Sequence, residues 1–185
     1  MRIGVFGGSF DPIHHGHLIA AAALAEALAL DEVRLVVARQ QPLKGGGHAA
    51  PPEDRAAMVE LAVRGDPRLQ AIRAELERDG PSYTADTLRS FRAEQPRAEL
   101  VLLLGADAAA ELPRWREADA VRALARVEVF SRNGGAAEWG GLRVPRVDIS
   151  STAIRALVRA GRSIRYWVPD AVAQYIAARR LYREA

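Results

Sequence analysis

Short apolar runs alternate with longer segments of helical spacing along the chain. Five runs are brief and rich in β-branched residues or leucine, a composition typical of strands. These expected strands are Arg2–Phe6, Glu32–Ala38, Leu69–Arg73, Glu99–Leu104 and Arg126–Phe130. Other segments repeat apolar residues at helical intervals. The expected helices are Gly16–Leu30, Glu53–Arg64, Tyr83–Glu94, Glu117–Leu124, Ser151–Ala160 and Pro169–Arg180.

The alternation of strands and helices indicates an α/β fold. The strands at Ile3 and Leu100 are almost continuously apolar, as expected when helices cover both faces of a parallel sheet. We expect a Rossmann-like, doubly wound parallel sheet with C-terminal helices, in strand order 3-2-1-4-5. Its length fits one domain over residues 1–185. The Gly- and Pro-rich segments Arg39–Pro52 and Asn133–Gly141 are expected surface loops.

Composition excludes several classes of protein. The longest nearly apolar stretch, Leu18–Leu30, is short and contains Glu26, so no membrane span is expected. Cysteine is absent, which excludes disulfides and thiolate metal sites, and no signal peptide is evident, so a cytoplasmic setting is expected. The net charge is only +3, and no basic run is interleaved with aromatics, so nucleic-acid binding is not expected.

The segment GGSFDPIHHGHL, residues 7–18, follows the first expected strand. Ligands of doubly wound sheets bind at the carboxyl ends of strands, so this position favours a nucleotide. Neither GxGxxG nor a P-loop is present. Instead, His14 and His17 lie three residues apart, on one side of a helix start, where two ring donors suit a polyphosphate. A metal site is the weaker alternative because no third ligand accompanies the pair.

A second motif, ISSTAIR, spans Ile149–Arg155. Ser150 or Ser151 is expected to cap a helix, leaving hydroxyl and N–H groups for an anion, and Arg155 follows one turn later. Both motifs resemble signatures of the nucleotidyltransferases that share a fold with class I aminoacyl-tRNA synthetases. SYTADTL, GAD, LPRW and SIRYWVPD resemble, in that order, segments of bacterial nicotinate-nucleotide adenylyltransferases. This resemblance covers essentially the whole chain.

The resemblance implies adenylyl transfer from ATP, with Mg²⁺ bridging the triphosphate, to nicotinate mononucleotide, giving nicotinate adenine dinucleotide and pyrophosphate. The implied catalytic residues are His14, His17 and Arg155. The implied ATP-binding residues are Gly7, Gly8, Ser9, Phe10, His14, His17, Arg132, Ser150, Ser151 and Arg155. The implied acceptor-binding residues are Lys44, Thr84, Asp107 and Trp115. No protein ligand for the metal is implied.

The sequence departs from the family pattern at two positions. Leu43 replaces the histidine that precedes the family lysine, here Lys44, and Leu157 replaces an arginine often found two positions after Arg155. Two other functions stay open. One is a sibling adenylyltransferase acting on phosphopantetheine or nicotinamide mononucleotide, and the other is a non-enzymatic module that binds nucleotides or nucleic acid. The sequence also allows a homodimer.

Overall fold

The computed structural model describes residues 1–40, 47–131 and 142–183. Its strands form one parallel sheet in the order β3-β2-β1-β4-β5-β6. They are β1 (Arg2–Gly8), β2 (Glu32–Val37), β3 (Leu69–Ile72), β4 (Glu99–Gly105), β5 (Arg126–Ser131) and β6 (Leu142–Arg143). The expected order of the first five strands is confirmed. The sequence does not predict β6, because a strand of two residues leaves no pattern.

The helices follow the expected segments within a few residues. They are α1 (His15–Ala27), α2 (Pro52–Val63), α3 (Thr84–Glu94), α4 (Ala106–Glu111), the 3-10 turn η1 (Leu112–Arg114), α5 (Ala118–Leu124), α6 (Ser151–Arg159) and α7 (Asp170–Ala178). The sequence pattern predicts no helix between β4 and α5, where the structure has α4 and η1. None of the described helices is long and apolar enough to cross a membrane.

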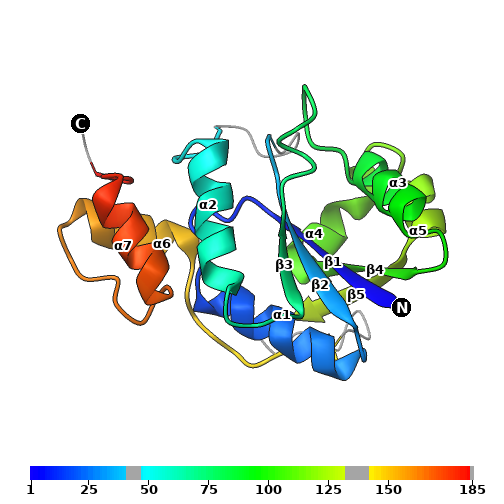
Figure 1. Cartoon of the computed structure of the whole chain (residues 1–185), viewed down its shortest axis with the longest axis horizontal. Helices are drawn as coiled ribbons and strands as arrows, with labels where there is room; N and C mark the ends of the chain where they lie inside the picture. The colour runs from blue at the N-terminus through cyan, green and yellow to red at the C-terminus, as the bar shows by residue number, and fades with distance from the viewer. Residues whose placement is uncertain (41–46, 132–141, 184–185) are drawn as a thin grey trace.

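Two apolar cores cover the two faces of the sheet. Adjacent residues of β4 alternate between them, with Leu102 in one core and Leu103 in the other, as the two-residue period of a strand requires. The first core contains Leu24 of α1 and Val59 of α2, and the second contains Leu88 of α3. Figure 1 shows α6 and α7 beside α2, at the end of the molecule opposite α3 and α5. The doubly wound fold is therefore confirmed.

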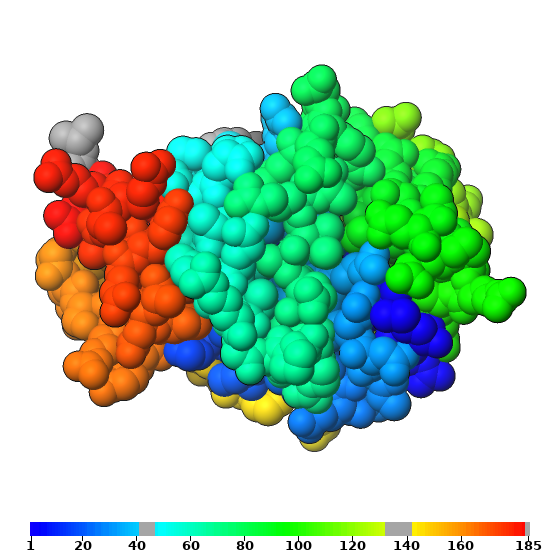
Figure 2. Space-filling model, viewed as in Figure 1, coloured from blue at the N-terminus to red at the C-terminus, as the bar shows by residue number. Residues whose placement is uncertain are grey.

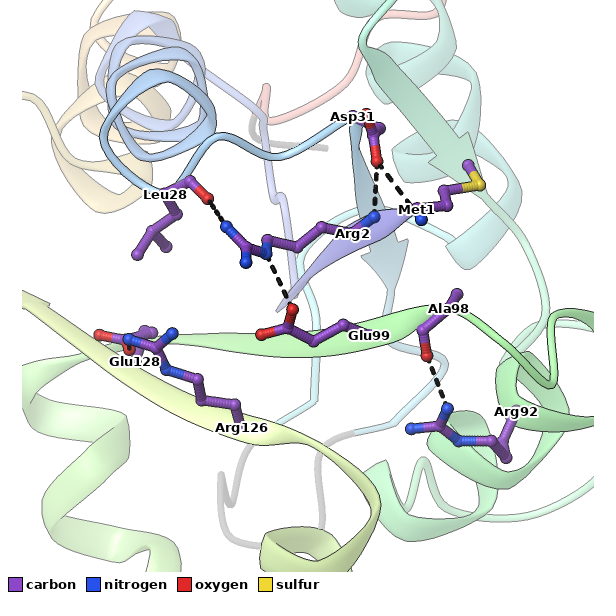
Figure 3. Close-up of polar contacts among 9 residues, drawn as sticks. All are labelled: Met1, Arg2, Leu28, Asp31, Arg92, Ala98, Glu99, Arg126 and Glu128. Carbon is purple, nitrogen blue, oxygen red and sulfur yellow. Dashed lines mark hydrogen bonds and ion pairs between the residues drawn. The ribbon is translucent and has the colours of Figure 1, made fainter.

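Arg2 holds the amino-terminal edge of the sheet (Figure 3). Its guanidinium donates to a carboxylate oxygen of Glu99 on β4 at 2.9 Å and to the carbonyl of Leu28, after α1, also at 2.9 Å. Its backbone N–H donates to Asp31, just before β2, at 2.6 Å. These contacts fix the start of β1 against β4 and the α1–β2 connection, at the edge opposite the motif loops.

At the carboxyl edge of the sheet, α2 contributes a fully buried arginine. The guanidinium of Arg55 is 0% exposed and donates to the carbonyls of Ser9 and Ala38, both at 2.7 Å. Further bonds reach the carbonyls of Arg39 at 3.2 Å and Ala50 at 3.3 Å. One side chain thus joins the loop after β1, the end of β2 and the start of α2.

We predict that Arg55→Met lowers the free energy of unfolding by about 3–5 kcal/mol, because it leaves several buried carbonyls without a donor. Chemical denaturation followed by circular dichroism measures the change. Arg89→Met is the matched control, because Arg89 is exposed and makes only surface ion pairs. Equal denaturation midpoints for the two variants would contradict this account of Arg55.

Candidate active site

The last residue of β1, Gly8, lies against an aromatic ring. β1 extends through Gly7 and Gly8, which pair with Val36 and Val37 of β2, so the placement of both glycines in the loop is wrong. A Cβ atom on Gly8 would lie 2.8 Å from the ring of Phe10. Phe10 has a φ of 47° and is only 2% exposed. Burial of its ring offsets the cost of this left-handed backbone.

The two motif histidines form a stacked pair where α1 begins. Their ring centroids lie 3.8 Å apart at an interplanar angle of 25°, and the backbone N–H of His14 donates to Nδ1 of His17 at 3.3 Å. His14 is 1% exposed and His17 is half-buried, so His17 is the more accessible ring. The glycine of HxGH is also explained, because a Cβ on Gly16 would approach the His14 ring to 3.0 Å.

Two backbone N–H groups at this helix start are already used within the protein. The N–H of His15 donates to the carbonyl of Trp167 at 3.1 Å, and that of His17 donates to the carbonyl of His14 at 2.9 Å. These two N–H groups are therefore not available to supplement the histidines in binding a phosphate. Trp167 belongs to the SIRYWVPD segment, which gives this C-terminal motif a role in fixing α1.

The serine motif returns to the loop after β1, as the sequence predicts. Ser150 caps α6, accepting the N–H of Ala153 at 3.1 Å. The Ser151 hydroxyl donates to the carbonyl of Pro12 at 2.9 Å, and Nη1 of Arg155 donates to the carbonyl of Asp11 at 2.7 Å. The structure thus brings Ser151 and Arg155 to the loop that precedes the two histidines.

Asp11 anchors this loop from within. Its carboxylate is 5% exposed and accepts the N–H of Ala49 at 2.7 Å and that of Ala50 at 3.1 Å. These residues precede α2 directly. The Asp11–Pro12 peptide bond is cis. The carboxylate of the FDP motif therefore faces the protein interior and not a ligand.

Three of the four expected acceptor residues, Asp107, Thr84 and Trp115, lie among the described residues. Val5 of β1 pairs with Leu102 of β4, so both strands end together, and exposed Asp107 lies in the first turn of α4. Thr84 is the first residue of α3. Trp115 follows η1 and packs, half-buried, on the second core.

Two contacts join the Trp115 segment to the start of α3. The guanidinium of Arg116 lies over the ring of Tyr83, 4.5 Å from its centroid, and Arg89 of α3 forms an ion pair with Glu117. Such a stack contributes about 0.5–1 kcal/mol at an exposed site. Thr84 and Trp115 are held in fixed relation as a result.

Beneath the first turns of α3 lies a buried carboxylate. Glu75 is 8% exposed and accepts the hydroxyl of Thr87 at 2.8 Å, and Arg78 also bonds Thr87. Burial raises the pKa of Glu75 above its ordinary value of 4.5, while hydrogen bonds from Ser82 and Thr87 oppose the rise. This hydrogen-bond network holds α3, which contains most of the SYTADTL motif, against the segment of Glu75.

Lys44 and Arg132 lie outside the described residues. Sequence reasoning missed three groups that position the site, namely Asp11, Arg55 and Glu75. A signal for Arg55 exists, because it shares a buried helix face with Met58 and Val59 at spacings of three and four residues. Within the described ranges, no three His, Cys, Asp or Glu side chains gather as a metal site.

A parallel sheet with a histidine pair after β1 and a serine-capped helix bonded to the same loop defines a nucleotidyltransferase-type α/β protein. Residues 5–157 match the Cytidylyltransferase-like family. A relative from Roseiflexus sp. (strain RS-1), named "Probable nicotinate-nucleotide adenylyltransferase", is 47% identical over 98% of each chain. One of the same name from Thermus thermophilus is 48% identical over 99% of this chain and 100% of its own. The chain belongs to the nicotinate-nucleotide adenylyltransferase family.

A solved structure confirms the fold. It is the Plasmodium falciparum nicotinic acid mononucleotide adenylyltransferase complexed with NaAD, with a TM-score of 0.79 and 18% identity. The superposition covers 98% of this chain and 97% of that one. At this low identity the likeness concerns the fold alone.

We predict that Glu75→Gln becomes more stable relative to the wild type as the pH rises from about 4 to about 8. A carboxyl whose pKa is raised by folding stabilises the fold below its ordinary pKa, and this contribution is lost as the pH rises through the folded value. Thermal unfolding across this range measures the difference in Tm. Glu77→Gln, at an exposed position two residues along, is the control. A difference between Glu75→Gln and the wild type that stays constant with pH would contradict the prediction.

Proposed function

We propose that the chain transfers the adenylyl group of ATP to nicotinate mononucleotide, giving nicotinate adenine dinucleotide and pyrophosphate. The observation that most supports this is the attachment of the serine motif to the loop after β1, through Ser151 and Arg155. It gathers a guanidinium, hydroxyls and two imidazoles from both ends of the chain at one sheet edge. Such a set suits a triphosphate.

The reaction needs positioning more than it needs a base. An oxygen of the acceptor's 5′-phosphate attacks the α-phosphorus of ATP in line, a new P–O bond forms, and the bond to the leaving pyrophosphate breaks. The attacking phosphate is already ionised near about pH 7, so no proton must be removed. The protein aligns the two phosphates and neutralises the charge that develops.

The proposed roles divide the phosphates of ATP among the motif residues. His17, the more accessible ring, contacts the α-phosphate in the transition state. Arg155, Ser151 and His14 act on the β- and γ-phosphates, with His14 also supporting the His17 ring from its buried position. Ser9 and N–H groups of the loop complete the ATP side, where Gly7, Gly8, Phe10, Ser150 and Arg132 are further proposed contacts.

Mg²⁺ is proposed to enter with ATP. The described residues at the motif loops present cations and hydroxyls and no carboxylate cluster, which fits a metal held by phosphate oxygens. When bound, the ion neutralises charge on the triphosphate. The residues that hold the metal complex are then those that hold the phosphates, His14, Ser151 and Arg155.

On the acceptor side, the start of α3 is proposed to receive the nicotinate carboxylate. Thr84 offers a hydroxyl at the positive end of the helix, and Trp115 offers an indole for stacking on the pyridine ring. Asp107 is proposed to hold ribose hydroxyls and Lys44 a phosphate. The Arg116–Tyr83 stack supports this pairing, since it joins the segments of Thr84 and Trp115.

The proposal includes one domain over residues 1–185 that works in the cytoplasm, where ATP is supplied. The single sheet with a core on each face supports one domain. A homodimer is compatible with it.

An acceptor assay tests the substrate. With ATP and Mg²⁺, pyrophosphate release should be fastest with nicotinate mononucleotide and slower with nicotinamide mononucleotide, because only the acid offers a carboxylate to α3. Phosphopantetheine should give no release above background. A preference for either alternative acceptor would replace the proposed substrate, and no release with any of the three would refute transfer itself.

His17→Ala should lower kcat by about 10²–10³-fold while leaving the fold intact, because one transition-state donor is lost. Steady-state kinetics and circular dichroism measure the two effects. His48→Ala, outside the motif, is the control and should keep wild-type kcat. Near-normal turnover of His17→Ala would exclude His17 from the chemistry.

A further inference from the structure

The C-terminal segment after α7 folds back to the loop that follows β1. Tyr182 is 9% exposed, and its hydroxyl donates to Oδ1 of Asp11 at 2.8 Å, across 171 positions of sequence. Figure 2 shows the C-terminal part of the chain, coloured orange to red and including α7, lying against α2 in cyan. A residue close to the end of the chain therefore contacts the FDP motif directly.

The carboxylate that Tyr182 contacts is saturated with donors. Asp11 also accepts the N–H groups of Ala49 and Ala50, and the charge of Arg55 lies nearby. Burial, with the negative charge of Asp11 beside it, raises the pKa of the Tyr182 phenol. The phenol stays protonated over the physiological range and is a permanent donor.

Asp11 relays this contact to the phosphate-binding side of the loop. Its backbone carbonyl accepts Nη1 of Arg155 at 2.7 Å, and the next carbonyl, that of Pro12, accepts the hydroxyl of Ser151. A rotation of Asp11 would therefore move the acceptor that orients Arg155. Asp11 is thus the single residue that is hydrogen-bonded to both Tyr182 and Arg155 along this path.

We propose that Tyr182 is a positioning residue for ATP: by holding the Asp11 carboxylate it fixes the loop after β1, and through the Asp11 carbonyl it fixes the Arg155 guanidinium. This inference rests on the proposed function. Tyr182 does not touch substrate in this account, and its effect is confined to the ATP side of the reaction.

A second tyrosine of the same segment provides a matched control. Tyr175 of α7 donates to Oδ1 of buried Asp54 at 2.7 Å, in a bond of the same chemistry as that of Tyr182. Asp54 lies on α2 and also accepts Nε of Arg179 at 2.9 Å. No described hydrogen bond of Asp54 reaches the motif loop. Tyr175→Phe therefore removes a tyrosine–aspartate bond that only stabilises.

The test compares Tyr182→Phe with Tyr175→Phe. Both should lower Tm by similar amounts. Only Tyr182→Phe should raise the KM for ATP and lower kcat, with kcat/KM for ATP reduced roughly tenfold, the equivalent of one lost hydrogen bond to a charged group. The KM for the acceptor should stay within about twofold of wild type in both variants.

Coupling to Arg155 gives a second readout. In an Arg155→Ala background, Tyr182→Phe should reduce kcat/KM for ATP by much less than in the wild type, because its effect runs through Arg155. Equal losses in both backgrounds, or equal kinetics of Tyr182→Phe and Tyr175→Phe, would overturn the inference. Asp11→Asn, which keeps the shape of the side chain, replaces Tyr182→Phe in the same comparison if the latter fails to fold.

Failure of the proposed function is distinguishable from failure of this inference. Calorimetric titration with ATP and Mg²⁺ needs no acceptor, and Tyr182→Phe should weaken ATP binding where Tyr175→Phe does not. If the wild type binds ATP but transfers nothing, the proposed reaction is refuted. The role of Tyr182 is then decided by the ATP affinities of the two variants alone. Equal ATP affinities of the two variants would overturn it.

Discussion

The site depends on one buried charge. Arg55 leaves water entirely, and burial lowers the pKa of its guanidinium while the nearby charge of Asp11 counters the shift. Desolvation of an ion costs several kcal/mol, and hydrogen bonds from the ion to buried acceptors offset this cost. Backbone carbonyls from three segments provide them. The loop after β1, the end of β2 and the start of α2 must therefore adopt one arrangement together, or the charge is left uncompensated.

This arrangement also sets the polarity of the motif loop. The carbonyls of Ser9, Asp11 and Pro12 accept from Arg55, Arg155 and Ser151, so their negative ends are already engaged by the protein. Because these carbonyl oxygens are paired with donors of the protein, the loop repels an approaching anion less than free carbonyls would. The proposed acceptor side is built differently, from a helix start supported by the Glu75–Thr87 bond and a tryptophan segment joined to it.

Local composition was enough to predict the first five strands, because β1, β2 and β4 are largely buried and read as nearly continuous apolar runs. Local motifs were enough to select His14, His17, Ser151 and Arg155 as candidates, and the structure brings them to neighbouring segments. The structure was needed for groups whose partners are distant in sequence, such as Arg55 with Ser9, and for α4, whose six residues are too short for a pattern. The backbone groups that bond Asp11 can belong to any residue type. The sequence therefore could not predict that the Asp11 carboxylate binds groups in the protein interior. The predictions for Lys44 and Arg132 concern residues that the structure does not describe.

The contact between Tyr182 and Asp11 has a consequence for the order in which the protein is made. Synthesis proceeds at about 5–20 residues per second, so the partner of Asp11 emerges on the order of ten seconds or more after Asp11 itself. During that interval the β1 loop lacks both the α6 residues and the tyrosine that complete it. A nascent chain can form β1 and α1 early, but the contact between Asp11 and Tyr182 can form only after Tyr182 has left the ribosome. The arrangement of the β1 loop is therefore completed late in synthesis, although the loop itself is made among the first residues.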